Sequence, residues 1–217
     1  MMDKETIRQI KSDFFALRNG VIADKLRSAG CPYKIIFGLT VPQIESVAAK
    51  HEPSARLAET LWANDSTRES RLMATMVFPV SEFSVDKAKK WIADADTVEL
   101  VDMLCFRLVR NVEGAEQLAF SLAGEEPTRY AGLRLLMNLL VVRKLADMEK
   151  AKGVASQWAE GGDAVARVAR NRVVLLIERK ANKNGVFFTE IQTKSLTLRW
   201  YDCDGRQIIL YRSHETG

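Results

Sequence analysis

Asp102 is a carboxylate placed where its charge could act on a cationic substrate. In a helix, with about 100° between successive residues, it falls at the margin of one wide apolar stripe. The stripe comprises Val98, Leu100, Val101, Leu104, Cys105 and Leu108. Partial burial there would make the charge more effective toward a cation, and would raise the pKa of Asp102 unless a basic group compensates. The alternative is a structural carboxylate paired with Arg71 or with a basic side chain of the next helix.

Other residue types that commonly do chemistry are scarce. The 217 residues include two His and three Cys, and the cysteines at positions 31, 105 and 203 form no C-x-x-C pair. His51 and His214 do not have metal-ligand spacing. The motifs G-x-x-x-x-G-K-[ST], G-x-G-x-x-G and G-x-S-x-G are absent, which leaves nucleotide-binding loops and a nucleophile elbow without support. We therefore expect no metal, no disulfide and no cofactor.

Helices are the elements predicted to position these residues. Apolar residues recur at helical spacing nearly everywhere before residue 182. Helix-start signals are Thr40 before Pro42, Ser54, Ser66 with Glu69, Ser84, Asp96 with Glu99, and Pro127. Helices of roughly 10 to 16 residues joined by short turns predict an all-α, superhelical stack of antiparallel helix pairs. Similar segments return every 30 to 45 residues or so, within the range of helical solenoids.

The end of the chain follows a different pattern. Leu196, Leu198 and Trp200 alternate with polar or aromatic residues, and Asp204-Gly205 supplies turn chemistry before a second β-prone run. The pattern predicts a β-hairpin that packs on the helices, since an isolated hairpin is marginal in water. We expect a helical domain over residues 1–184 and a C-terminal tail over 185–217.

Charge is concentrated in one part of the chain. Residues 1–126 carry 16 Lys+Arg and 19 Asp+Glu, residues 127–185 carry 12 and 5, and residues 186–217 carry 4 and 4. A basic block of this kind is the usual mark of a polyanion site, because each cation near a phosphate releases condensed counterions. A solvated basic helix face is the alternative.

No segment predicts membrane insertion or export. The longest nearly apolar stretch, 135–142, contains Asn138 and is far shorter than the roughly 20 residues that a membrane span needs. Charged residues at positions 8, 11 and 13 leave no apolar run for a secretory signal. We expect a cytoplasmic protein that does not bind membranes.

Three stretches resemble a known family. They are LAETLWA at 57–63, RESRLMA at 68–74 and WIADADTVELVDMLC at 91–105, with a fainter continuation through RYAG at 129–132 and 178–184. They are similar to the DNA alkylation repair glycosylases built from HEAT-like helical repeats. The resemblance implies a concave, all-helical solenoid that holds duplex DNA and removes cationic N-alkylated purines without a metal.

The resemblance also gives Asp102 a role, because it matches the carboxylate position of that family. An alkylated purine is already cationic, so its glycosidic bond breaks without a strong general acid. A fixed anion beside the sugar then stabilises the developing positive charge and can orient the attacking water.

Three positions depart from the family pattern. The family has a tryptophan four residues before the aspartate, where this chain has Val98, and a second tryptophan that falls at Leu175. Its arginine in the following helix aligns with Tyr130, or with Arg129 if the register slips by one residue. Since tryptophan and arginine faces contribute stacking and cation–π contacts of about 0.5 to 2 kcal/mol each, their loss would weaken the preference for a charged lesion.

The candidate phosphate contacts lie in the basic block. They are Arg129, Arg134, Arg143, Lys144, Arg170, Arg172, Arg179 and Lys180, near predicted helix ends or faces. Pairing with nearby carboxylates is the structural alternative. Trp62, Trp91 and Trp158 lie at apolar helical spacing and are expected in the core.

Three functions are consistent with these observations. The first is a metal-independent DNA N-glycosylase in which Asp102 stabilises the sugar cation. The second is a DNA-binding protein on the same scaffold that has no catalytic activity. The third is a protein-interaction solenoid whose acidic N-terminal half forms the partner surface.

Overall fold

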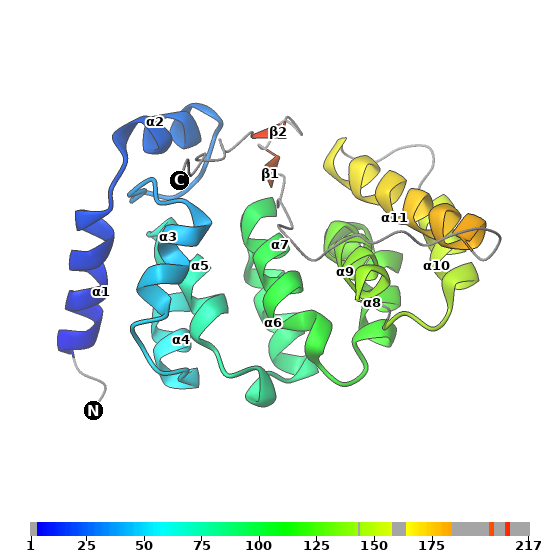
Figure 1. The fold of residues 1–217 in the computed structure, drawn as a ribbon, viewed down its shortest axis with the longest axis horizontal. Helices are drawn as coiled ribbons and strands as arrows, with labels where there is room; N and C mark the ends of the chain where they lie inside the picture. The colour runs from blue at the N-terminus through cyan, green and yellow to red at the C-terminus, as the bar shows by residue number, and fades with distance from the viewer. Residues whose placement is uncertain (1–3, 143, 158–163, 184–199, 202–206, 209–217) are drawn as a thin grey trace, which may run out of the picture.

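The computed structural model describes residues 4–142, 144–157, 164–183, 200–201 and 207–208. Helices make up most of the described chain (Figure 1). The α-helices are α1 (Lys4–Ala16), α2 (Gly20–Ser28), α3 (Val41–Ala48), α4 (Ala55–Trp62), α5 (Arg68–Val77), α6 (Val85–Asp94), α7 (Val98–Arg107), α8 (Ala115–Gly124), α9 (Arg129–Val141), α10 (Met148–Gln157) and α11 (Ala164–Lys183). Three short 3-10 helices are η1 (Val80–Glu82), η2 (Val109–Asn111) and η3 (Glu126–Thr128).

The helices stack in pairs along the long axis of the molecule, from α1 at one end to α10 and α11 at the other (Figure 1). Within the stack, α4 packs on α5, α6 on α7, α8 on α9 and α10 on α11. One helix of each pair also contacts the corresponding helix of the next pair, which gives a central row of α3, α5, α7, α9 and α11. The predicted all-α stack of antiparallel helix pairs is therefore confirmed.

Three of the six predicted helix starts are confirmed, and Pro127 lies in η3, just before α9. Ser54 and Ser84 each accept an N–H from the first turn of the following helix, and the Gln43 side chain accepts the Thr40 N–H at 2.8 Å. Two expected starts are wrong by one residue: α5 follows Thr67 instead of Ser66, and α7 follows Thr97 instead of Asp96. In both cases the acid expected to complete the capping box turns to a distant part of the chain.

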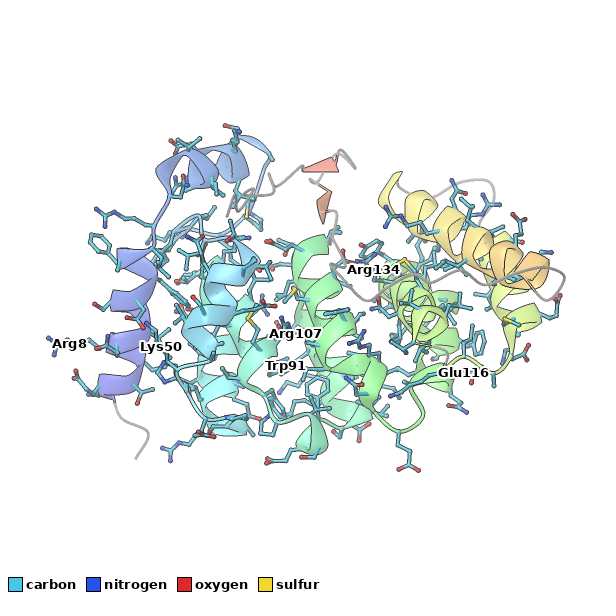
Figure 2. The ribbon with its side chains drawn as sticks, viewed as in Figure 1. Arg8, Lys50, Trp91, Arg107, Glu116 and Arg134 are labelled. Atoms are coloured by element: carbon cyan, nitrogen blue, oxygen red, sulfur yellow. The ribbon has the colours of Figure 1, made fainter. Side chains whose placement is uncertain are left out.

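The core runs continuously through the stack and holds the predicted tryptophans. Trp62 and Trp91 are buried and stack with ring centroids 4.0 Å apart (Figure 2 labels Trp91). Phe78 and Phe83 meet the Trp91 ring edge-on, at 5.5 Å each. The expected core role of these two tryptophans is confirmed, whereas Trp158 lies outside the described residues.

Of the C-terminal tail, the structure describes two short strands. β1 (Trp200–Tyr201) pairs antiparallel with β2 (Gln207–Ile208), with Trp200 opposite Ile208. This pairing agrees with the predicted hairpin, although its expected turn at 204–205 lies outside the described residues. The expected boundary at 184/185 stays a prediction. None of the helices in the described part of the chain is both long and apolar enough to cross a membrane.

Candidate functional site around Asp102

Asp102 lies in the interface between α7 and α9, with 3% of its surface exposed. The Tyr130 hydroxyl donates a hydrogen bond to its Oδ1 at 2.6 Å. The Arg134 Nε lies 2.7 Å from the same oxygen and forms an ion pair with it. Tyr130 and Arg134 are four residues apart, on one face of α9, and so reach the same carboxylate. Both residues therefore hold Asp102 from the facing helix (Figure 2 labels Arg134).

Burial controls the ionisation of this carboxylate. Desolvation raises the pKa of Asp102 from 3.8 to about 6, although the charge of Arg134 and the hydrogen bond from Tyr130 act in the opposite direction. Glu99 raises this pKa further and Arg172 lowers it. Burial also raises the pKa of the Tyr130 hydroxyl well above its ordinary value, so that group stays protonated and can donate. At neutral pH the site is an ion pair between Asp102 and Arg134.

This geometry limits what Asp102 can do. A carboxylate that stabilises a sugar cation has to approach the sugar directly. Asp102 is buried, and one of its oxygens is already occupied by Tyr130 and Arg134. A substrate could reach it only if these two side chains moved. In this conformation the carboxylate joins two helices.

The three expected pocket residues lie in different environments. Val98 is the first residue of α7 and is half-buried, four residues before Asp102 on the same helix. Tyr130 contacts Asp102 directly, so the family arginine position and the aspartate are neighbours in space. Leu175 lies on α11 with 49% of its surface exposed. The structure thus brings Tyr130 to the carboxylate.

The basic candidates also differ in exposure. The side chains of Arg129 and Arg134 are buried, and Arg134 is committed to Asp102. Lys144 is exposed. Arg170 donates from Nε to the Ala155 carbonyl at 3.2 Å. Arg172 is half-buried and close enough to Asp102 to lower the pKa of that carboxylate. Arg143 lies outside the described residues, as do the side chains of Arg179 and Lys180 on α11.

A second buried carboxylate, Glu69, was not singled out from the sequence as a site. It is fully buried at the start of α5 and accepts the backbone N–H groups of Phe37, Gly38 and Leu39 at 3.0 to 3.3 Å. Arg68 donates to Glu69 at 2.9 Å and also pairs with Glu99 of α7. Since a Glu three residues after Ser66 fits a capping box, the local pattern concealed this long-range role.

The family model described as DNA alkylation repair enzyme matches residues 10–128, more than half of the chain. The chain belongs to this family. Among solved structures, one is similar over 84% of this chain and 80% of its own, with a TM-score of 0.71 and 17% sequence identity. It is described as representing a new family of proteins related to the HEAT-like repeat DNA glycosylases with affinity for branched DNA structures. The likeness shows that this DNA alkylation repair family member has the HEAT-like fold. No curated protein matches the chain.

The region matched by the family model includes Asp102 but ends before the residues that hold it. Tyr130 and Arg134 lie just beyond residue 128. The carboxylate of this family member is thus within the shared part of the sequence, whereas its two partners come from the part that the model does not match.

Arg71 is not the partner of Asp102, which corrects one of the two structural pairings expected from the sequence. Its guanidinium forms ion pairs with Asp94 at 2.7 Å and Asp96 at 3.2 Å, and lies over the Trp62 ring. The other expected pairing was with a basic side chain of the next helix. The observed partner is Arg134, which lies further along the chain, on α9.

Several carboxylates of the acidic N-terminal half form ion pairs within this family member. Asp13 of α1 pairs with Lys50 at 2.9 Å, and Glu45 of α3 pairs with Arg107. Glu59 of α4 pairs with Lys87 of α6. These ion pairs tie neighbouring helices together and reduce the negative charge available to a partner. Among the described residues, no three His, Cys, Asp or Glu side chains come together in a way that could hold a metal ion.

Proposed function

We propose that this protein binds DNA through the phosphate backbone and does not use Asp102 to cleave a glycosidic bond. The observation that supports this proposal most is that Asp102 is closed off from solvent and from substrate. Its carboxylate is 3% exposed, and Oδ1 is held by the Tyr130 hydroxyl and the Arg134 Nε. Val98 and Leu175 reinforce it, since neither offers the aromatic face that would stack on a charged lesion.

DNA as the partner is supported by three further observations. The chain belongs to the DNA alkylation repair enzyme family, and the structure that shares its fold represents proteins with affinity for branched DNA. Residues 127–185 carry 12 Lys+Arg against 5 Asp+Glu. We assign phosphate contacts to Arg143, to the exposed Lys144 and to four basic residues of α11, which are Arg170, Arg172, Arg179 and Lys180. Arg134 is assigned to Asp102 instead.

A DNA N-glycosylase is the second candidate, because Asp102 occupies the family carboxylate position inside the matched region. With a pKa of about 6, it would be ionised at the pH of a repair reaction and could stabilise a sugar cation. This mechanism requires Tyr130 and Arg134 to leave the carboxylate when DNA binds. It therefore makes a different prediction for Asp102→Asn.

One experiment with two readouts separates these functions. Fluorescence anisotropy on a duplex oligonucleotide should give an affinity that falls steeply with salt, and Lys144→Gln should weaken binding and reduce the salt slope by about 1. Lys89→Gln is the matched control, because Lys89 is an exposed lysine of α6 outside the basic block. A flat salt response, together with stoichiometric capture of a protein, would favour the interaction solenoid instead.

The second readout is release of 3-methyladenine or 7-methylguanine from alkylated duplex DNA. We expect no release above background from the wild type or from Asp102→Asn. Release by the wild type that is lost in Asp102→Asn would establish the glycosylase and contradict the proposal. Salt-dependent binding without release is the result that the closed carboxylate predicts.

A further inference from the structure

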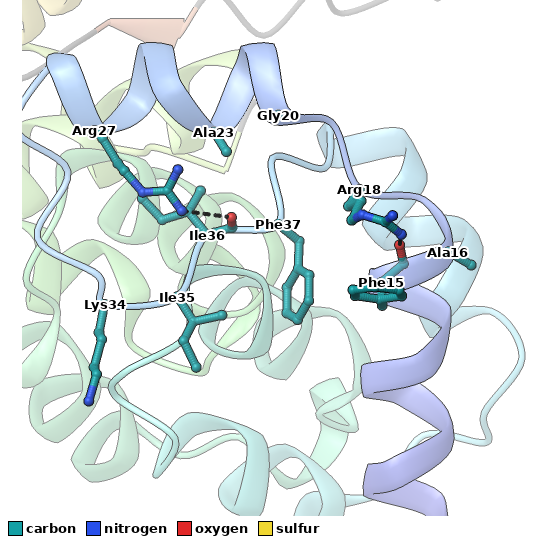
Figure 3. Close-up of a pocket in the computed structure, with 10 residues that line it drawn as sticks. All are labelled: Phe15, Ala16, Arg18, Gly20, Ala23, Arg27, Lys34, Ile35, Ile36 and Phe37. Carbon is teal, nitrogen blue, oxygen red and sulfur yellow. Dashed lines mark hydrogen bonds between the residues drawn. The ribbon is translucent and has the colours of Figure 1, made fainter.

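A cavity of about 690 Å³ opens where the end of α1 meets α2 and the loop 34–37. Its volume is within the range of pockets that hold a small ligand, roughly 300 to 1,000 Å³. The lining combines apolar and basic side chains, as Figure 3 shows. Those that matter here are Phe15, Arg18, Arg27, Lys34, Ile35 and Phe37.

The cavity is positively charged. No Asp or Glu is among the residues that line it. Arg27 is paired with Asp24 at 3.0 Å, but no carboxylate among the described residues lies within ion-pair distance of Arg18 or Lys34. Arg18 donates only to the Phe15 carbonyl, at 2.8 Å, and Lys34 is exposed. Two cations are thus available to an anionic ligand.

Exposed apolar surface lies beside these cations. The Phe15 side chain is 57% exposed, and the Arg18 guanidinium lies 3.8 Å from the centroid of its ring (Figure 3). Ile35 is 42% exposed on the loop. The guanidinium covers one face of the ring, and the rest of the ring is exposed. Exposed aromatic surface beside a cation suits a ligand that has both a flat ring and a phosphate.

The wall of the cavity is held rigidly. The Asn19 N–H donates to the Phe37 carbonyl at 2.8 Å, and the Phe37 ring packs on Phe14 with centroids 5.8 Å apart. Glu69 accepts the N–H groups of residues 37–39. Gly38 has a φ of +78°, and a Cβ there would come within 2.1 Å of the Asn19 carbonyl oxygen. A wall that is already ordered loses little entropy when a ligand binds.

We infer that this pocket, formed by Phe15, Arg18, Lys34 and the loop 34–37, receives one unpaired nucleotide of a DNA strand. The base lies on the exposed part of the Phe15 ring and the adjoining phosphate contacts Arg18, while Lys34, on the other side of the pocket, adds to its positive charge (Figure 3). A paired base cannot do this, because both of its faces are stacked inside the duplex. The inference rests on the proposed DNA binding and adds to it a preference for DNA that contains unpaired nucleotides.

The test compares three probes: a blunt duplex, the same duplex with a single-stranded overhang, and the overhang as a free oligonucleotide. Anisotropy should show the wild type binding the overhang duplex more tightly than the blunt one. Phe15→Ala should weaken binding to the overhang duplex by about tenfold, and Arg18→Gln by about fivefold. Neither should change binding to the blunt duplex by more than about twofold.

Two further variants complete the test, one as a matched control and one as a second way to block the pocket. Arg8→Gln removes a cation from α1 that is exposed and lies outside the pocket, and it should leave the overhang preference unchanged (Figure 2). Gly20→Leu adds a side chain at the pocket lining where a Cβ meets no atom within 4 Å. It should fill the pocket and weaken overhang binding without lowering the unfolding temperature.

The outcomes separate the two proposals. Salt-dependent binding of the blunt duplex with no added affinity for the overhang, or with Phe15→Ala equal to the wild type, would overturn the pocket and leave the proposed function standing. Binding of the overhang duplex and the free oligonucleotide that depends on Phe15, with no binding of the blunt duplex, would support the pocket and contradict binding to the duplex backbone. Absence of binding to all three probes would overturn both.

Discussion

Two buried carboxylates occupy neighbouring helices of the central row, and their surroundings differ. Glu69 of α5 and Asp102 of α7 each pair with an arginine, Arg68 and Arg134 respectively. Glu69 also accepts three backbone N–H groups from the loop after α2. Asp102 accepts one hydrogen bond, from the Tyr130 hydroxyl, beside its ion pair with Arg134. The first carboxylate therefore accepts several hydrogen bonds, whereas the second accepts one.

The comparison shows that burial alone does not identify a chemical site. A buried carboxylate with many donors organises the backbone around it, as Glu69 does for residues 37–39. A buried carboxylate with few donors keeps a large part of its desolvation cost, which is why the pKa of Asp102 is raised to about 6. The two carboxylates should therefore respond differently to mutation, and the raised pKa of Asp102 should make its contribution to stability depend on pH.

Glu69→Gln should have the largest effect. The amide keeps only one acceptor oxygen for the three loop N–H groups, and it removes one of the two carboxylates that pair with the buried Arg68, the other being Glu99. Breaking a buried pair on one side costs about 3 to 5 kcal/mol, so the free energy of unfolding should fall by about that amount in urea titrations. Glu59→Gln is the control, because Glu59 is exposed and its pair with Lys87 should contribute no more than about 1 kcal/mol. Equal losses for the two variants would contradict the comparison.

Arg134→Met should cost somewhat less, about 3 kcal/mol, because the uncompensated Asp102 can take up a proton instead of remaining charged. The double variant Arg134→Met/Asp102→Leu should regain most of this loss, since it leaves no buried charge. Urea unfolding of the two single variants and the double variant gives the coupling energy. Additive losses would mean that the two side chains do not act as a pair.

The general architecture could be predicted from the sequence, because helix pairs depend on local signals. Apolar periodicity and the caps at Thr40, Ser54 and Ser84 are properties of short segments, and all three are observed. The capping boxes predicted at Ser66 and Asp96 do not form, because Glu69 and Glu99 instead bond to residues about 30 positions away. A local pattern cannot reveal a competing partner that distant.

The site was predictable only in part, for the same reason. Asp102 was expected at a margin of an apolar stripe, and the resemblance gave Tyr130 as a pocket residue. The structure places the two side chains in contact. The role of Arg134 was missed because α9 is buried on nearly every side, so its sequence does not indicate which face meets α7. Resemblance also could not show that Asp102 is closed off. That depends on how α7 and α9 pack.

The smallest effect should be the pH dependence of stability that Asp102 contributes. Its pKa is about 6 in the folded protein and 3.8 ordinarily, so the folded state binds the proton more tightly. The resulting stability is fully present below about pH 4 and is lost as the pH rises through about 6. The asparagine side chain of Asp102→Asn does not titrate in this pH range. The difference in unfolding free energy, wild type minus Asp102→Asn, should therefore fall by about 2 kcal/mol between pH 4.5 and 7.

Only the change with pH is diagnostic, because the asparagine also leaves Arg134 without a counter-charge and so shifts the whole curve by a constant amount. Tyr130→Phe sharpens the test, since it removes the hydrogen bond that lowers the pKa of Asp102. In that variant the loss of stability should move to higher pH. A difference that is constant from pH 4.5 to 7 would mean that the pKa of Asp102 is not raised in the folded protein, and so that Tyr130 and Arg134 compensate fully for the burial of this carboxylate.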